Sequence, residues 1–105
     1  MTEIRIVDII GSNCLVDVDD AQKIYKMVSD HLRKKECVTI SFAGVDQIIT
    51  AFANAAIGQL YSRFSEETIR ELITLSEMDD IVHETVSSSV ERAKATAKRK
   101  QEETR

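Results

Sequence analysis

Apolar positions near the start of the chain form two short runs. Residues 3–10 alternate in part between apolar and polar side chains, and residues 14–18 form a second run that is mostly apolar. Gly11-Ser12-Asn13 separates the two runs, and these residue types are typical of turns. The pattern therefore predicts two strands joined as a hairpin.

The rest of the chain mixes helical spacing with β-branched runs. Cys37 to Phe42 is apolar and β-branched, which is typical of a buried central strand. Further elements are expected as helices at 19–35, 51–64 and from 78 into the C-terminal tail, and as a strand at 71–75. Helices that alternate with strands imply crossover connections. We therefore expect an α/β fold with a single four-stranded mixed β-sheet flanked by about three helices.

Composition agrees with one globular domain. The 105 residues are 43% hydrophobic and 30% charged, which suits a modest core. The chain contains no apolar run of about 18 residues, and its first residues lack the pattern of a secretory signal. We therefore expect a cytoplasmic protein without a membrane partner. Cys14 and Cys37 lie far apart among apolar residues and are expected to be buried free thiols.

Charge is unevenly spread along the chain, whose net charge is −4. Residues 91–105 carry six basic and three acidic side chains, a balance of +3, so residues 1–90 have a balance of −7. Binding to nucleic acid relies on clustered basic residues that neutralise phosphates. The acidic body therefore argues against nucleic acid as the main ligand, and Lys98-Arg99-Lys100 fits the C-terminal end of a helix.

Motifs for catalysis do not occur in the sequence. A glycine-rich phosphate loop, a Gly-x-Ser-x-Gly elbow and a His-Glu-x-x-His zinc motif are all missing. Asp17, Asp19 and Asp20 resemble the start of a calcium loop, but Gln22 and Val28 occupy the positions of its glycine and glutamate. We therefore expect no enzyme activity, no metal and no cofactor.

The helix expected at 51–64 has an unusual outer face. Its inner face is apolar and predicts core packing, whereas the opposite face carries small uncharged residues. That outer face consists of Ala51, Asn54, Ala55, Gly58, Gln59 and Ser62. Gly58 costs about 1 kcal/mol in a helix interior relative to alanine, so a compensating close contact is expected. The face is either a docking surface for a protein partner or a second copy, or it is covered by another part of the same chain, such as the helix at 19–35.

The segment around this helix resembles a known family. Residues 38–51 resemble the strand–loop–helix centre of STAS domains, which occur in sulphate transporters and anti-sigma factor antagonists. Residues 49–54, followed by Gly58-Gln59-Leu60, are similar to bacterial STAS-like domains of unknown function. The resemblance implies a regulatory module, which we place at residues 1–92, and the charge pattern predicts a charged helical tail at 93–105.

The resemblance also implies a partner and a modification site. Anti-sigma factor antagonists dock a histidine-kinase-like ATPase, which phosphorylates the second serine of an Asp-Ser-Ser-Gly motif. Ile49 and Ala51 replace the aspartate and the acceptor serine here, so only Thr50 keeps a hydroxyl group. Thr50 is therefore the candidate phosphorylation site, and without a phosphate we expect it to be the N-cap of the helix.

A second hypothesis places a binding site in the loop at 43–46. Loops at the ends of strands in α/β sheets often form ligand crevices. Gly44 and Asp46 would then bind a small molecule or a nucleotide. Docking of a partner and sensing of a ligand remain alternatives at this point.

Overall fold

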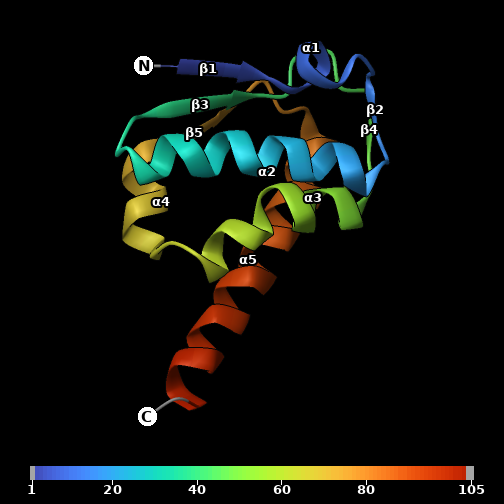
Figure 1. The fold of residues 1–105 in the computed structure, drawn as a ribbon. Coiled ribbons are helices and arrows are strands. Elements are labelled where there is room, and N and C mark those ends of the chain that lie inside the picture. Colours follow the sequence, from blue (N-terminus) through green and yellow to red (C-terminus); the bar gives the residue numbers. More distant parts are fainter. Residues whose placement is uncertain (1, 104–105) are drawn as a thin grey trace.

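The computed structural model describes residues 2–103, with side chains for residues 2–97 (Figure 1). Strands and helices alternate along most of the chain, as the sequence predicts. The strands are β1 (Thr2–Arg5), β2 (Cys14–Leu15), β3 (Val38–Ser41), β4 (Gln47–Ile48) and β5 (Ile73–Ser76). The α-helices are α1 (Ile6–Ile10), α2 (Val18–Arg33), α3 (Thr50–Ala56), α4 (Glu66–Leu72) and α5 (Asp80–Glu103), and a 3-10 helix, η1 (Gly58–Ser62), follows α3.

The main sheet contains three parallel strands in the order β1-β3-β5. Ile40 in the central strand aligns with Ile4 on one side and Leu75 on the other. The predicted buried central strand is confirmed, because the side chains of Val38 and Ile40 are almost fully buried. The α/β class is also confirmed. The single four-stranded mixed sheet is wrong, since β2 and β4 pair with each other, in parallel, as a separate two-stranded sheet.

The N-terminal hairpin does not form. After β1 the chain turns into the short helix α1, which ends at Gly11 in the left-handed conformation (φ +71°). Ile6, Ile9 and Ile10 have spacing that suits a helix as well as part of a strand, so the apolar pattern alone was ambiguous. Glycine adopts a positive φ without the steric cost of a Cβ atom, which explains why the helix stops there.

The small β2–β4 sheet depends on contacts between Asn13 and Asp46. The side-chain amide of Asn13 donates to the Asp46 carboxylate at 2.7 Å, and the Asn13 carbonyl accepts from the Asp46 backbone N–H at 2.8 Å. These bonds connect the turn after α1 to the loop after β3. The strands that lead into α2 and α3, which are β2 and β4, therefore lie side by side.

Helix α2 closely follows its predicted bounds. The Asp17 side chain caps its N-terminus by accepting from the Asp19 backbone N–H at 2.8 Å. Its apolar face is buried, including Ile24 and Val28. This face and the buried residues of the main sheet belong to one hydrophobic core.

The helix predicted at 51–64 is interrupted. Helix α3 ends at Ala56, and the chain tightens into η1 from Gly58, a residue with low helix propensity. The predicted inner face is otherwise in the core, because Ala53, Ala56 and Leu60 are buried.

Helix α4 is absent from the sequence-based assignment, which left residues 65–67 as a connection. Ser65 caps this helix by accepting from the Thr68 backbone N–H at 3.1 Å, and Glu66 and Glu67 occupy its first turn. The strand predicted at 71–75 forms as β5, two residues later at its start.

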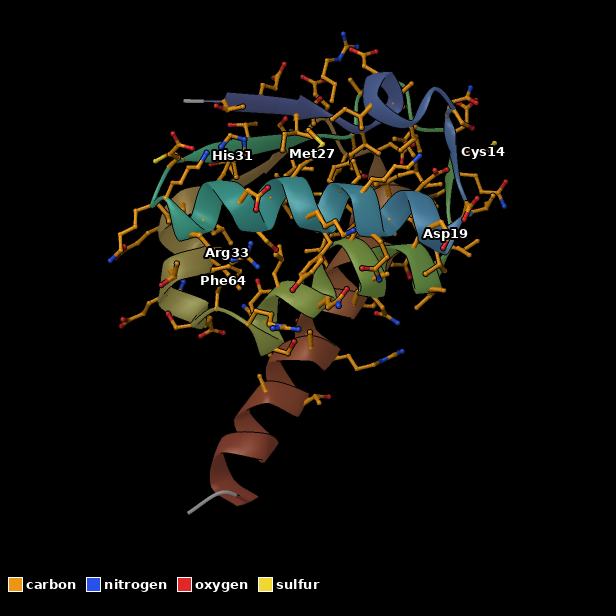
Figure 2. The ribbon with its side chains drawn as sticks, viewed as in Figure 1. Cys14, Asp19, Met27, His31, Arg33 and Phe64 are labelled. Carbon is orange, nitrogen blue, oxygen red and sulfur yellow. The ribbon has the colours of Figure 1, made fainter. Side chains whose placement is uncertain are left out.

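Helix α5 packs against α3 and η1, and its C-terminal half extends beyond the other elements (Figure 1). It is one continuous helix across the predicted boundary between residues 92 and 93. Within residues 2–103, none of the helices has the length and hydropathy that a bilayer crossing requires. The predicted burial of the thiols is wrong, because Cys14 and Cys37 are both exposed. Figure 2 shows Cys14 on the short strand β2.

Candidate functional site

An open groove of about 550 Å³ lies between α3–η1 and the outer part of α5, with the start of α2 at one end. It contains all six residues of the predicted outer face: Ala51, Asn54, Ala55, Gly58, Gln59 and Ser62. The remaining lining residues come from α2 and α5: Val18, Gln22, Ser89, Arg92, Ala93, Thr96 and Ala97. We call this surface the α3–α5 groove.

The wall formed by α3 and η1 is made of small side chains. Ala51 and Ser62 are exposed, Asn54 and Ala55 are half-buried, and Gly58 is buried. Because these side chains are short, another helix can approach the backbone of α3 closely.

Helix α5 closes the groove at Gly58. A Cβ atom built at Gly58 would lie 3.5 Å from the Ala93 Cβ atom and 3.8 Å from the Ser89 carbonyl oxygen. Part of the predicted docking face is therefore covered by the same chain. The covering element is the last helix, whereas the sequence suggested the helix at 19–35.

The wall formed by α5 was missed by the sequence analysis, which treated residues from 93 onwards as a charged tail. Ser89, Ala93 and Ala97 recur at intervals of four, so these small residues share one face of the helix. That spacing was the available signal. It matches the small residues of α3 and η1 on the other side of the groove.

The start of α2 forms the end of the groove. The Gln22 side-chain amide donates to the Gln59 side-chain oxygen at 3.3 Å, which joins α2 to η1. Val18, in the first turn of α2, is exposed and adds apolar surface there.

Arg92 is the only charged residue among those that line the described groove. It is exposed on α5, and it forms no ion pair with another residue of the part described with side chains. The groove is therefore mainly apolar and uncharged, with a single positive group on its α5 wall.

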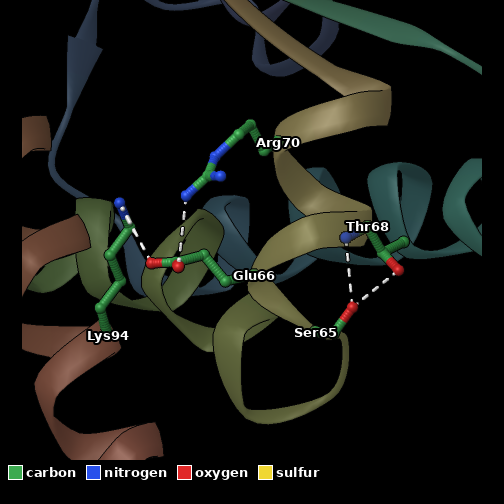
Figure 3. A network of polar contacts seen from close by, with 5 residues as sticks. All are labelled: Ser65, Glu66, Thr68, Arg70 and Lys94. Atoms are coloured by element: carbon green, nitrogen blue, oxygen red, sulfur yellow. Dashed lines mark hydrogen bonds and ion pairs between the residues drawn. The ribbon is translucent and has the colours of Figure 1, made fainter.

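The opposite side of α5 is held by an ionic cluster (Figure 3). Glu66 accepts from Lys94 at 3.4 Å and from Arg70 at 3.3 Å, so the carboxylate links α5 to α4. The Lys94 ammonium lies 6.0 Å from the centre of the Tyr61 ring. Burial, followed by the Glu66 charge, raises the pKa of Tyr61 above its usual value, and the Arg70 charge opposes this increase. These contacts join α5 to α4 and add to the packing of α5 against η1 and α3.

Thr50 lies beside the groove and does not line it. It is exposed and is the first residue of α3, whereas Ile49 occupies the N-cap position without a side-chain cap. The predicted N-cap role of Thr50 is therefore wrong by one residue. Phosphorylation of Thr50 stays a prediction.

The loop at 43–46 lies away from the residues of the groove. Gly44 has a positive φ of +81° and is exposed. The Asp46 carboxylate is bonded to Asn13, which gives it a structural role in joining β2 and β4. Ligand binding by Gly44 and Asp46 stays a prediction.

Metal-ligating side chains do not gather in the part of the chain described with side chains. Within it, no group of three or more His, Cys, Asp or Glu residues is placed to hold an ion. Phe52, on α3, is buried in the core and does not line the groove. The groove is therefore suited to contact with apolar and small groups.

Comparison with known proteins identifies the family. Residues 20–83, which include most of α2 and all of β3, β4, α3, η1, α4 and β5, match the model of the STAS-like domain of unknown function (DUF4325). No curated protein and no solved structure gives a significant match to the chain. Since the match extends over more than half of the residues, the chain belongs to the family of STAS-like domains of unknown function.

Proposed function

We propose that this protein is a non-catalytic regulatory module, acting in the cytoplasm, that docks another protein in the α3–α5 groove. The observation that supports this proposal is the composition of the groove. Three helical elements contribute short, mostly uncharged side chains to one open surface. Small residues on a helical surface leave room for a partner's side chains to insert between them.

Helix-in-groove binding is the mode of recognition that suits this surface. An amphipathic helix binds such a groove with apolar side chains spaced three or four residues apart. Ala51, Ala55 and Ala93 would contact these side chains, and Arg92 would select an acidic residue on the partner. Polar groups such as the Asn54 side chain would fix the orientation of the bound helix.

Family resemblance supports the same location. In anti-sigma factor antagonists, the start of the helix that corresponds to α3 controls the complex with a kinase-like ATPase. A partner of that class, or another regulator, is therefore part of the proposal. A phosphate on Thr50 would add negative charge beside the groove and would release a partner that carries acidic groups.

The test compares the wild-type protein with variants that fill the groove. Ala51→Arg and Ala55→Arg place a long charged side chain on the α3 wall. Ala95→Arg is the matched control, because Ala95 is an exposed residue of α5 outside the groove lining. Each tagged variant is used to capture proteins from cells, and folding is checked by circular dichroism.

The expected result is a protein that binds the wild type and Ala95→Arg but not the two α3 variants. Purified partner should then show a loss of affinity of at least about tenfold with Ala51→Arg by calorimetry. Equal binding to all four proteins would contradict the assignment of the groove. A complex that is lost only with Thr50→Glu would shift the docking site to the first turn of α3.

A further inference from the structure

Side chains of opposite charge lie beside the α3–α5 groove and on its α5 wall. Asp17 and Asp19 are exposed on either side of Val18, and Figure 2 shows Asp19 in the first turn of α2. Arg92 lies on the α5 wall, and the sequence continues into the basic segment 98–100. Within residues 2–97, Asp19 and Arg92 form no ion pair, so both charges are available to an occupant.

We propose that the occupant of the groove is a second copy of this chain, related to the first by a twofold axis. The proposal rests on the proposed function, since it assigns a partner to the same groove. In a twofold dimer one surface contacts itself with its direction reversed. Asp19, beside the groove at the start of α2, then faces Arg92 on the α5 wall of the other copy, twice in each dimer.

Charge along the whole chain favours the same arrangement. Residues 1–90 have a balance of −7 and residues 91–105 a balance of +3, and the C-terminal half of α5 extends beyond the body (Figure 1). An extended basic helix can reach the acidic body of a neighbouring copy. Opposite potentials of this kind select one orientation of two surfaces over others.

A polar atom beneath the groove also lacks a partner. Ser89 is 1% exposed, and its Oγ atom has no hydrogen-bond partner among the described residues. Leaving a buried hydroxyl unpaired is unfavourable, and a polar side chain from an occupant would satisfy it after a small shift of α5. A purely apolar ligand would leave this atom unsatisfied.

The size of the surface predicts a weak dimer. Stable interfaces usually involve about 20–30 residues from each partner, and the groove supplies about half of these. The dimer is therefore expected to dissociate in the micromolar range, and to weaken as salt screens the charges at its rim.

The experiment measures the dissociation constant of the untagged full chain by sedimentation equilibrium. Four proteins are compared: wild type, Asp19→Arg, Arg92→Asp, and the double variant with both changes. Lys34→Asp is the charge-reversal control, because Lys34 is exposed at the far end of α2. The Asp19 and Arg92 side chains are both exposed, so the charge reversals should not disturb folding. If a reversal does disturb folding, the neutral variants Asp19→Asn and Arg92→Gln replace it.

Each single reversal should weaken the dimer about tenfold, since two attractive contacts become repulsive in every dimer. The double variant should return to within about threefold of the wild type, and Lys34→Asp should not change the constant. Failure of the double variant to recover would place the interface elsewhere and overturn the proposal. Assemblies larger than a dimer would also overturn it, because a closed twofold contact cannot extend.

The same experiment separates the two proposals. A wild-type protein that is monomeric at millimolar concentration refutes self-association. If that monomer still binds a different protein that Ala51→Arg abolishes, the proposed function of the groove stands without the dimer. If no binding of either kind depends on Ala51, both proposals fail.

Discussion

Substitution of Gly58 offers the most direct test of how α5 packs against η1. Gly58 is buried and does not have a positive φ, so an L-amino acid can adopt its backbone conformation. A Cβ atom there would meet the Ala93 Cβ atom at 3.5 Å, which is within the optimal range for two carbon atoms. We therefore expect Gly58→Ala to be stabilising, although the residue lies at a close contact between two elements.

The expected magnitude follows from the unfolded state. Replacing glycine with alanine at a compatible position gains about 0.4–1 kcal/mol, because the unfolded chain has fewer conformations. For a domain of this size, that corresponds to a rise in melting temperature of roughly 2–8 °C. Gly58→Val should instead cost about 1–3 kcal/mol, since its added methyl groups would overlap the Ala93 side chain.

Gly11 provides the matched control. A Cβ atom at Gly11 would meet nothing within 4 Å, yet this residue has a φ of +71°. Gly11→Ala should therefore cost about 1 kcal/mol through backbone strain alone. The two alanine substitutions should therefore change the free energy of unfolding in opposite directions, with Gly58→Ala stabilising and Gly11→Ala destabilising. Available space alone would predict that Gly11→Ala is tolerated better than Gly58→Ala.

Urea unfolding followed by circular dichroism measures these free energies of unfolding. A double-mutant cycle with Ala93→Gly should show that the cost of Gly58→Val falls by at least about 0.5 kcal/mol when Ala93 is shortened. Destabilisation by Gly58→Ala beyond about 0.5 kcal/mol, or a coupling of zero, would refute the described contact between η1 and α5.

Three other predictions concern single side chains. Burial, and then the Glu66 charge, raises the pKa of Tyr61 above 10.0. The protonated Tyr61 side chain therefore contributes fully to stability below about pH 10, and this contribution is lost as the pH rises through the raised pKa. Tyr61→Phe should reduce that alkaline loss in urea unfolding between about pH 9 and 11.5, and an unchanged pH profile would argue against it. Asn13→Ala, Asp46→Ala and the double variant should each lower the free energy of unfolding by about 1 kcal/mol, because all three remove the same 2.7 Å hydrogen bond. If the cost of the double variant equals the sum of the two single costs, the two side chains do not interact with each other. Ser29→Ala should raise the free energy of unfolding by about 1 kcal/mol, because the buried Ser29 Oγ atom has no hydrogen-bond partner among the described residues, and a decrease would reveal a hydrogen bond.

Much of the candidate site could be predicted from one helix. The absence of charge from Ala51 to Ser62 was visible in the sequence, and the structure places all six predicted residues of the outer face in one groove. Thr50, the candidate phosphorylation site, lies beside the groove. The α5 wall was missed because its small residues are interspersed with charged ones, such as Arg92 and Lys94, that lie on other faces or at the rim.

Elements whose residue patterns have a single structural interpretation could be identified before the fold was known. The apolar period of α2 and the β-branched run of β3 each fit only a helix or only a buried strand, and both form close to the predicted bounds. The run from Ile6 to Ile10 fits both periods, so only its tertiary surroundings and the conformation of Gly11 made it a helix.

Tertiary structure alone decided which strands pair and what lies against α3. Pairing of β2 with β4 depends on the bonds between Asn13 and Asp46, which are 33 positions apart, and local patterns carry no information about such contacts. Gly58 and Ala93, which are in contact, are also far apart in the sequence. The sequence therefore indicated that α3 has a surface for close packing, and only the fold showed that α5 covers part of it and leaves the remainder as an open groove.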